Sequence, residues 1–306
     1  MKKKKNKASA ASVNGRLVSK PIQRCFPIFM LPTFIAFCIG FIWPFVQGIY
    51  LSLCKFTTPK NATFVGLGNY ITALQDSGFR YSFGYTTIFA IVSIISINVL
   101  AFIVAYFLTQ NIKGANIFRT VFFMPNLIGG IVLGYIWSMS FDGILQRYGT
   151  FLLAETKYGF WGLVILMCWQ QIGYMMIIYI AGLQSIPEDM MEAAKIDGAT
   201  KMQTLFKITI PNVMSSITIC VFLTLTNSFK LFDQNLALTG GMPVKFGEGG
   251  SMVNTTEMLA LNIYSTFYTG ANSRGIAQAK AVLFFVLVAV LALAQLKFTR
   301  EKEVQQ

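Results

Sequence analysis

Six long apolar runs, separated by polar segments, dominate this 306-residue chain. Their approximate bounds are 26–53, 85–108, 121–139, 160–183, 213–232 and 277–296. Each is close to the roughly 20 residues that an α-helix needs to cross the hydrocarbon layer of a bilayer. Only 12% of the residues are charged, about half of what a soluble domain carries. The runs therefore predict an all-α membrane protein with six transmembrane helices.

The distribution of positive charge predicts how these helices are oriented. Of the 25 basic residues, 16 fall in the segments 1–25, 110–119, 184–211 and 297–306. Cytoplasmic loops carry an excess of Lys and Arg, so these segments are expected on the cytoplasmic side. We therefore predict a basic cytoplasmic segment at 1–25, a transmembrane domain at 26–298 and a cytoplasmic tail at 299–306. Because the charges flank apolar runs, the net charge of +13 indicates membrane orientation rather than nucleic-acid binding.

The composition also argues against an enzyme. The chain has no histidine, which removes the commonest general base and the commonest metal ligand. Cys38, Cys168 and Cys220 lie inside apolar runs, and no CxxC pair occurs. We expect apolar free thiols, no metal site and no catalytic residue.

The loop at 184–211 has the pattern of a short helix and its stop. Pro187 suits a first helical position, acidic residues follow it, and Gly198 is a natural terminator. A second short helix is expected at about 201–208, and Pro211 is expected to open the fifth span. Ala193 and Ala194 would form a flat spot on which a partner's groove can close, with Glu192 as a charged anchor. The same pattern also fits a solvated loop helix without a partner.

The fifth run is more polar than the others. It contains or adjoins Thr224, Asn227, Ser228, Lys230 and Gln234. Within this set the residues 227, 230 and 234 follow a spacing of three and four, which places them on one helix face. Polar groups at membrane depth usually face a cavity or a partner, so this face is a candidate solute path. In the alternative, Lys230 and Asp233 lie at the outer interface and pair with each other.

Several motifs together resemble one family, the binding-protein-dependent ABC importer permeases. The loop carries the family's EAA motif, and the flanking features resemble the carbohydrate-uptake branch, similar to the maltose and glycerol-phosphate permeases. The residues of the loop motif are Glu192-Ala193-Ala194, Asp197-Gly198-Ala199, Phe206, Ile210 and Pro211. The flanking features are Val65–Tyr70, Phe122–Pro125, Trp137, Trp169, Gly173, Ala181–Pro187, Phe232-Asp233 and Leu238–Pro243. Met242 stands where the family often has a third glycine.

The resemblance implies a type I ABC importer fold in a bacterial or archaeal plasma (inner) membrane. It implies a second related permease, a cytoplasmic ATPase dimer and an external solute-binding protein as partners, besides membrane lipid. The loop would be the coupling helix for the ATPase, through Glu192, Ala193, Ala194, Asp197, Gly198, Ala199, Phe206 and Pro211. The solute would be a carbohydrate or a related polyol. No cofactor is expected on this chain, since it has no GxxxxGK[ST] motif; ATP with magnesium would be used by the partner ATPase.

A stand-alone secondary transporter or channel is the competing hypothesis. Such a protein would need coupling ions and would work without ATP. Most acidic residues fall in loops, so the sequence offers no evident buried carboxylate chain for protons.

Overall fold

The computed structural model describes residues 20–110, 112–246 and 252–300. The predicted basic terminus therefore falls mostly outside the described residues, as does most of the predicted tail. The chain divides into two compact units, residues 1–50 and 51–306.

The described part of the first unit, from Lys20 on, is one run of helix. Helix α1 covers Lys20–Phe37, a π-helical turn covers Cys38–Ile42, and α2 covers Trp43–Ser52, whose last two residues belong to the second unit. The rings of Phe37, Phe41 and Phe45 stack at successive turns, with centroids 5.1 and 6.1 Å apart. Large apolar side chains are exposed along this run. The stretch Ile28–Ser52 is long and apolar enough to cross a membrane.

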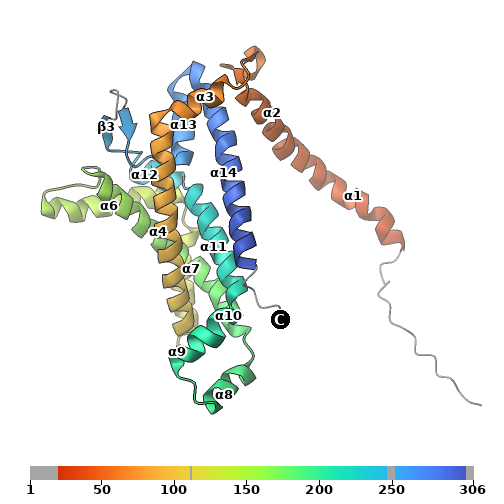
Figure 1. The fold of residues 1–306 in the computed structure, drawn as a ribbon, viewed down its shortest axis with the longest axis vertical. Coiled ribbons are helices and arrows are strands. Elements are labelled where there is room, and N and C mark those ends of the chain that lie inside the picture. Colours follow the sequence, from red (N-terminus) through yellow and green to blue (C-terminus); the bar gives the residue numbers. More distant parts are fainter. Residues whose placement is uncertain (1–19, 111, 247–251, 301–306) are drawn as a thin grey trace, which may run out of the picture. The chain divides into compact units, whose positions relative to one another are not determined.

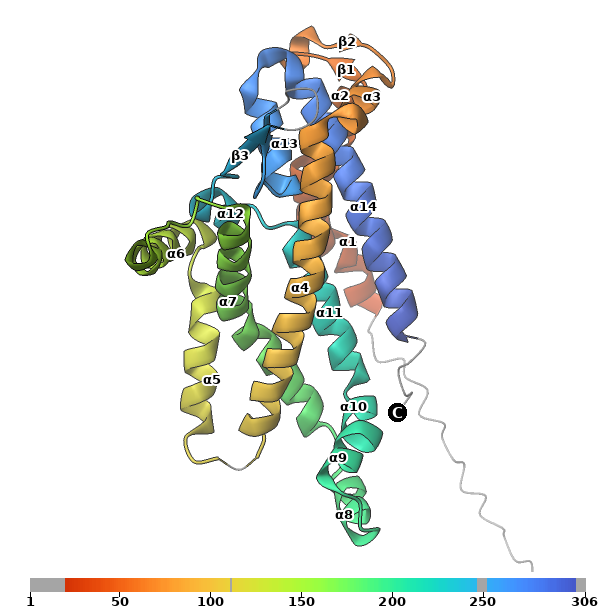
Figure 2. The ribbon, with the colours of Figure 1, turned by 60° about the vertical axis from the view of Figure 1, so that its left-hand side comes forward.

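The second unit is a bundle whose longest helices are α4 (Ser77–Leu108), α7 (Thr156–Gln184) and α14 (Arg274–Arg300). Helix α4 packs closely on α7 and on α11 (Met214–Phe229), as Figures 1 and 2 show. Small buried residues such as Ala90, Ala101 and Ala105 line α4 and allow the close approach. The core around them contains Phe89, Ile97, Leu163, Leu166 and Met167.

Two of the six predicted spans are bent pairs of helices. The first pair is α5 (Ala115–Phe123), continued by a 3-10 turn at Met124–Leu127, and α6 (Gly130–Leu145), with a bend of 100°. The second runs through α9 (Lys201–Thr204), a π-helical turn η5 (Leu205–Thr209) and α10 (Ile210–Asn212) into α11, with a bend of 69°. The described residues hold four unbroken helices long and apolar enough to span, and six spans when each bent pair counts as one.

Packing against another helix explains the first bend. A Cβ on Gly134 would lie 2.5 Å from Cβ of Ala237, and one on Gly130 would lie 2.8 Å from Cβ of Asp233. Both partners belong to α12 (Asp233–Leu238). The two glycines therefore allow a close approach between the helices, and α6 turns aside to meet α12. The straight helix expected over 121–139 is corrected to this bent pair.

Short elements close the end of the bundle opposite α8 (Glu188–Ile196). Strands β1 (Cys54–Lys55) and β2 (Thr63–Phe64) pair antiparallel, and α3 (Gly68–Gln75) follows a 3-10 turn at Pro59–Asn61 and β2. Strands β3 (Val244–Phe246) and β4 (Met252–Asn254) also pair antiparallel, in register Val244↔Asn254. Helix α13 (Leu259–Thr269) follows β4. Further 3-10 turns cover Gln146–Tyr148 and Ala271–Ser273.

The two basic loops of the second unit, the α4–α5 link and the segment from α8 to η5, lie at the same end of it. In Figure 2 the link between α4 and α5 lies at the same end as α8 and α9. Lys113 lies in that link, while Lys195, Lys201 and Lys207 lie in or beside α8, α9 and η5. This arrangement agrees with the side assigned to these segments by charge.

Candidate functional site

Helix α8 begins and ends where its sequence predicts, with one correction. Pro187 is the residue before the helix, with φ −58° and ψ 133°, rather than its first residue. Glu188 and Asp189 occupy the first turn, where the helix dipole favours acids. Gly198 has φ 74°, which a glycine adopts without strain. The amide of Ala199 donates to the carbonyl of Ala194 at 3.0 Å and closes the helix end.

The flat spot of two alanines is not present on the surface of α8. Ala193 is exposed together with Glu192, but Ala194 is only 5% exposed. Of the two alanines, therefore, only Ala193 is available at the surface of this structure. Asp197 and Gly198 are exposed, and Ala199 is half-buried.

Large apolar side chains are instead exposed on α8 and at the start of α9, a region here called the tip. They were not predicted from the sequence. Ile196 is 86% exposed, and Met190 and Met202 are also exposed. These residues lie among charged neighbours such as Lys195 and Lys201. Because they stand in one polar loop, these apolar side chains are a candidate docking surface. The only sequence signal is that these apolar residues stand in a segment too polar to enter the membrane.

A tight helix contact lies at the base of the tip. A Cβ on Gly182 of α7 would lie 2.2 Å from Oγ of Ser216 in α11. Helix α9 is fixed by a capping box, in which Thr200 Oγ accepts from the Gln203 amide and Gln203 Oε1 accepts from the Thr200 amide at 2.8 Å. The chain on either side of the tip thus continues into α7 and α11, which cannot separate without loosening the contact between Gly182 and Ser216.

Two of the predicted coupling residues lie apart from α8. Phe206 is on η5 and lines an apolar groove with Leu205 and Ile210. Pro211 lies within α10, before the bend, and α11 begins only at Met214. The prediction that Pro211 opens the fifth span is corrected, because the chain bends by 69° between them.

The polar residues of the fifth span divide into two groups. Thr224 and Ser228 are buried inside the bundle. Thr224 Oγ1 donates to the carbonyl of Cys220 at 2.8 Å and accepts from Asn98 Nδ2 of α4 at 3.2 Å. The hydroxyl of Tyr179 in α7 donates to Asn98 Oδ1 at 2.7 Å. These groups join α4, α7 and α11 at mid-height, so Thr224 acts as a structural link between helices.

The second group is paired with glutamines of α7. Asn227 Nδ2 donates to Gln171 Oε1 at 3.1 Å, and Gln234 Nε2 donates to Gln170 Oε1 at 2.7 Å. Gln170 Nε2 in turn donates to the carbonyl of Ile128, in the break between α5 and α6, at 3.3 Å. Neither α7 glutamine was predicted as a site residue, although two adjacent amides within an apolar run were a usable signal.

Lys230 stands apart from both groups. Helix α11 ends at Phe229 and α12 begins at Asp233, so Asn227, Lys230 and Gln234 do not share one helix face as predicted. The ammonium of Lys230 is exposed, and no ion pair joins it to Asp233 within the described part of the chain. The pairing that the alternative interpretation required is therefore not formed in this structure.

A buried charge network fixes the opposite end of the bundle. Lys280 of α14 is 1% exposed, and its Nζ donates to Asp76 Oδ2 at 2.5 Å, Asn262 Oδ1 at 2.9 Å and Thr266 Oγ1 at 2.7 Å. Glu257 accepts from Asn262 Nδ2 at 2.9 Å. The network ties the start of α4 to α13 and α14.

Comparisons with known proteins agree on one family. A sequence profile of the family described as binding-protein-dependent transport system inner membrane component matches residues 98–302. The chain is 41% identical over 286 residues to the probable starch degradation products transport system permease protein AmyD of Thermoanaerobacterium thermosulfurigenes, covering 91% of this chain and 94% of that one. It is 30% identical over 286 residues to the multiple sugar-binding transport system permease protein MsmF of Streptococcus mutans, covering 90% and 95%.

A solved structure has the same fold. A chain of a bacterial ABC transporter involved in the import of the acidic polysaccharide alginate superposes with a TM-score of 0.75 at 19% identity. The superposition covers 92% of this chain and 98% of that chain.

Proposed function

We propose that this chain, which belongs to the family of binding-protein-dependent transport system inner membrane components, is a permease subunit of an ATP-driven importer for a carbohydrate or a related polyol. As a member of that family it is a multi-pass protein of the plasma (inner) membrane. The names of the similar permeases support the solute class, since they refer to starch degradation products and multiple sugars. Mono-, di- and oligosaccharides, polyols and glycerol phosphates all fit this class.

The proposed assembly contains three kinds of partner. A second, related permease subunit completes the pathway, an extracellular binding protein delivers the solute, and a cytoplasmic ATPase dimer supplies the energy. ATP with magnesium is bound by that ATPase and not by this chain.

The exposed tip of α8 is the observation that carries the coupling proposal. Glu192, Ala193 and Ile196 are exposed there, next to the close contact between Gly182 and Ser216. A partner's groove that closes on the tip buries apolar area and at the same time meets the carboxylate of Glu192. When the ATPase dimer closes, α8 moves with it, and the tight base passes the displacement to α7 and α11 as a rigid-body motion.

The paired amides form the proposed solute path. Gln170 with Gln234 and Gln171 with Asn227 present donors and acceptors suited to sugar hydroxyls. Without solute, the two amides of each pair are hydrogen-bonded to each other. A sugar hydroxyl both donates and accepts, so it can insert between the two amides of a pair and leave both hydrogen-bonded. Lys230, exposed beyond the end of α11, lies at the edge of the path.

Reconstitution distinguishes this proposal from a secondary transporter. The chain is purified with its co-expressed permease and ATPase partners, placed in liposomes and supplied with the loaded binding protein. We expect solute uptake that requires ATP on the side of the membrane that carries the ATPase. Uptake should stop when ATP is replaced by a non-hydrolysable analogue. Gradient-driven uptake by this chain alone, without ATP, would contradict the proposal.

A further inference from the structure

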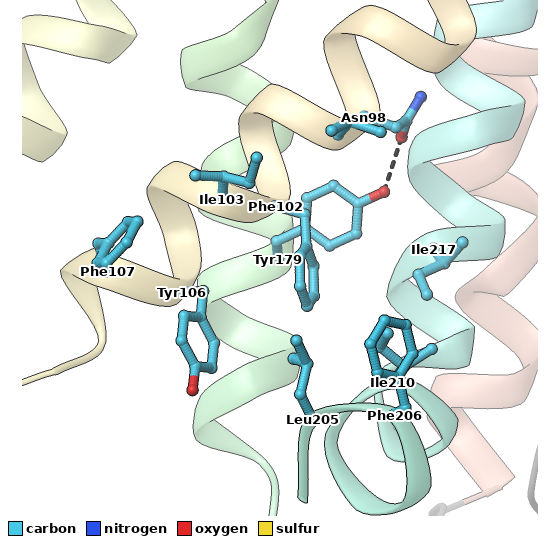
Figure 3. A pocket seen from close by; sticks show the side chains of 11 residues that line it. Asn98, Phe102, Ile103, Tyr106, Phe107, Tyr179, Leu205, Phe206, Ile210 and Ile217 are labelled. Carbon is cyan, nitrogen blue, oxygen red and sulfur yellow. Dashed lines mark hydrogen bonds between the residues drawn. The ribbon is translucent and has the colours of Figure 1, made fainter. Parts of the chain in front are cut away.

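An apolar groove runs along the side of α4 near its C-terminal end. Its volume is about 530 Å³, and its walls come from α4, α7, η5, α10 and α11. Figure 3 shows Ile103 and Phe107 on one wall, with Phe206 and Ile210 opposite. The polar groups at its inner end, Asn98 and the hydroxyl of Tyr179, are bonded to each other at 2.7 Å. Between these groups and Tyr106 the groove therefore offers a hydrocarbon surface.

The length of the groove matches one leaflet of a bilayer. It follows α4 from Asn98 to Phe107, which is about 14 Å along a helix axis. The hydrocarbon of one leaflet is about 15 Å thick, half of the whole core. Helix α4 ends at Leu108, so the groove occupies the leaflet on the side of α8.

A polar pocket adjoins the open end of the groove. The two share Tyr106, whose hydroxyl in Figure 3 points away from the apolar wall. The polar pocket has a volume of about 370 Å³ and is lined by Thr109, Gln110, Gln184 and Glu188 among others. Glu188 is its single ionisable side chain apart from Tyr106. The combined site is thus apolar at membrane depth and polar, with one carboxylate, at the cytoplasmic end.

We infer that this site binds a phospholipid of the cytoplasmic leaflet, with one acyl chain in the groove and an ammonium-bearing headgroup beside Glu188. The apolar part excludes sugars and ions, which would lose their hydration there. The carboxylate of Glu188 favours an ethanolamine headgroup over an uncharged glycerol headgroup. A helix of another subunit would fill the apolar part, but it would not account for the adjoining polar pocket.

The position of the headgroup places the bound lipid beside α8. Glu188 and Met191 of the polar pocket belong to α8, the helix that also carries the exposed residues Glu192, Ala193 and Ile196. A bound lipid therefore connects α4 to α8 at the point where the chain would receive a displacement from the ATPase. The inference goes beyond the proposed transport role, because lipid binding is measured without ATP or solute.

Photo-crosslinking in the assembled transporter tests the inference. The probe is a phosphatidylethanolamine with a diazirine in one acyl chain, incorporated in nanodiscs of phosphatidylethanolamine and phosphatidylglycerol. We expect crosslinks concentrated in peptides that contain residues 98–107 and 205–217. An excess of unlabelled phosphatidylethanolamine should reduce them more than an equal excess of phosphatidylglycerol does.

Two tryptophan substitutions on the same helix provide the matched comparison. Ile103→Trp fills the groove, whereas Ile95→Trp adds the same side chain at an exposed position of α4 outside it. If the new indole displaces two methylene groups of the acyl chain from the groove, lipid binding weakens about tenfold. We therefore expect groove labelling to fall by about that factor in Ile103→Trp and to stay unchanged in Ile95→Trp. Glu188→Gln should remove the preference for phosphatidylethanolamine.

Three results would overturn the inference. Equal labelling of all lipid-facing helices would mean that the probe reports only bulk bilayer. Absence of label in the groove of the assembled transporter, with label elsewhere, would mean that another subunit covers it. Equal competition by the two phospholipids would refute the role given to Glu188.

Discussion

Replacing Lys280 by Met removes the charge at the centre of the buried network while keeping most of the side-chain volume. Its ammonium makes three hydrogen bonds, at 2.5, 2.9 and 2.7 Å, to Asp76, Asn262 and Thr266. Removing one partner of a buried ion pair costs about 3–5 kcal/mol. The side chain of Asp76 is 37% exposed, so water stabilises part of the charge left behind. We therefore expect Lys280→Met to lower the free energy of unfolding by about 2–4 kcal/mol.

The thiol of Cys54 provides the assay. It is fully buried at the same end of the bundle, and Gly275 of α14 packs against its carbonyl. We expect alkylation of Cys54 under native conditions to become roughly 30- to 700-fold faster in Lys280→Met, which corresponds to the loss in free energy when alkylation follows transient opening. The control is Lys245→Met, which removes an exposed lysine of β3 and should leave the rate nearly unchanged.

A double substitution separates the ion pair from general damage. Asp76→Asn combined with Lys280→Met should cost less than the sum of the single changes, with a coupling of at least about 1 kcal/mol. Cys54 protection that is equal in Lys280→Met and Lys245→Met would refute the reasoning, because it would mean that the network contributes nothing to stability.

Three further substitutions test the packing, the solute path and the tip. Gly173→Ala places a Cβ 1.8 Å from the carbonyl oxygen of Phe122, and we expect a loss of about 1–3 kcal/mol or more in thermal unfolding; wild-type stability would contradict the close packing. Gln171→Leu removes the acceptor of Asn227 and should raise the apparent KM for solute roughly 2- to 12-fold, the value of one hydrogen bond, while an unchanged KM would exclude it from the path. Ala193→Arg, at an exposed position, should preserve folding but weaken ATPase co-purification, and normal recovery of the ATPase would argue against the docking surface.

Local sequence signals predicted α8 well because its ends depend on neighbouring residues. Acids after Pro187 and a glycine at 198 are sufficient to place a helix of this length. The bend between α5 and α6 was not predicted, because its cause is distant in sequence. Gly130 and Gly134 meet α12 about a hundred residues later, and no periodicity within 121–139 records that contact.

The polar contacts of the fifth span were predicted in part for the same reason. Asn227 and Gln234 were identified as polar residues at membrane depth, but their partners Gln170 and Gln171 lie on another helix. The helical pattern was extended through Lys230, although α11 ends one residue earlier. Lys280 was read as part of an apolar run, since its carboxylate partner Asp76 lies 204 residues away.

The central claim is that closure of the ATPase dimer moves this chain through α8. Glu192→Arg in the reconstituted transporter tests this claim most directly. Glu192 is exposed, so the fold should survive the change. Placing the opposite charge in a closed interface costs about 2–5 kcal/mol, which predicts a loss of roughly 30-fold or more in ATP-driven uptake, with KM for solute unchanged. Lys113→Glu, a charge reversal in the α4–α5 link at the same end, should keep normal uptake. Wild-type uptake and ATPase association in Glu192→Arg would contradict the claim.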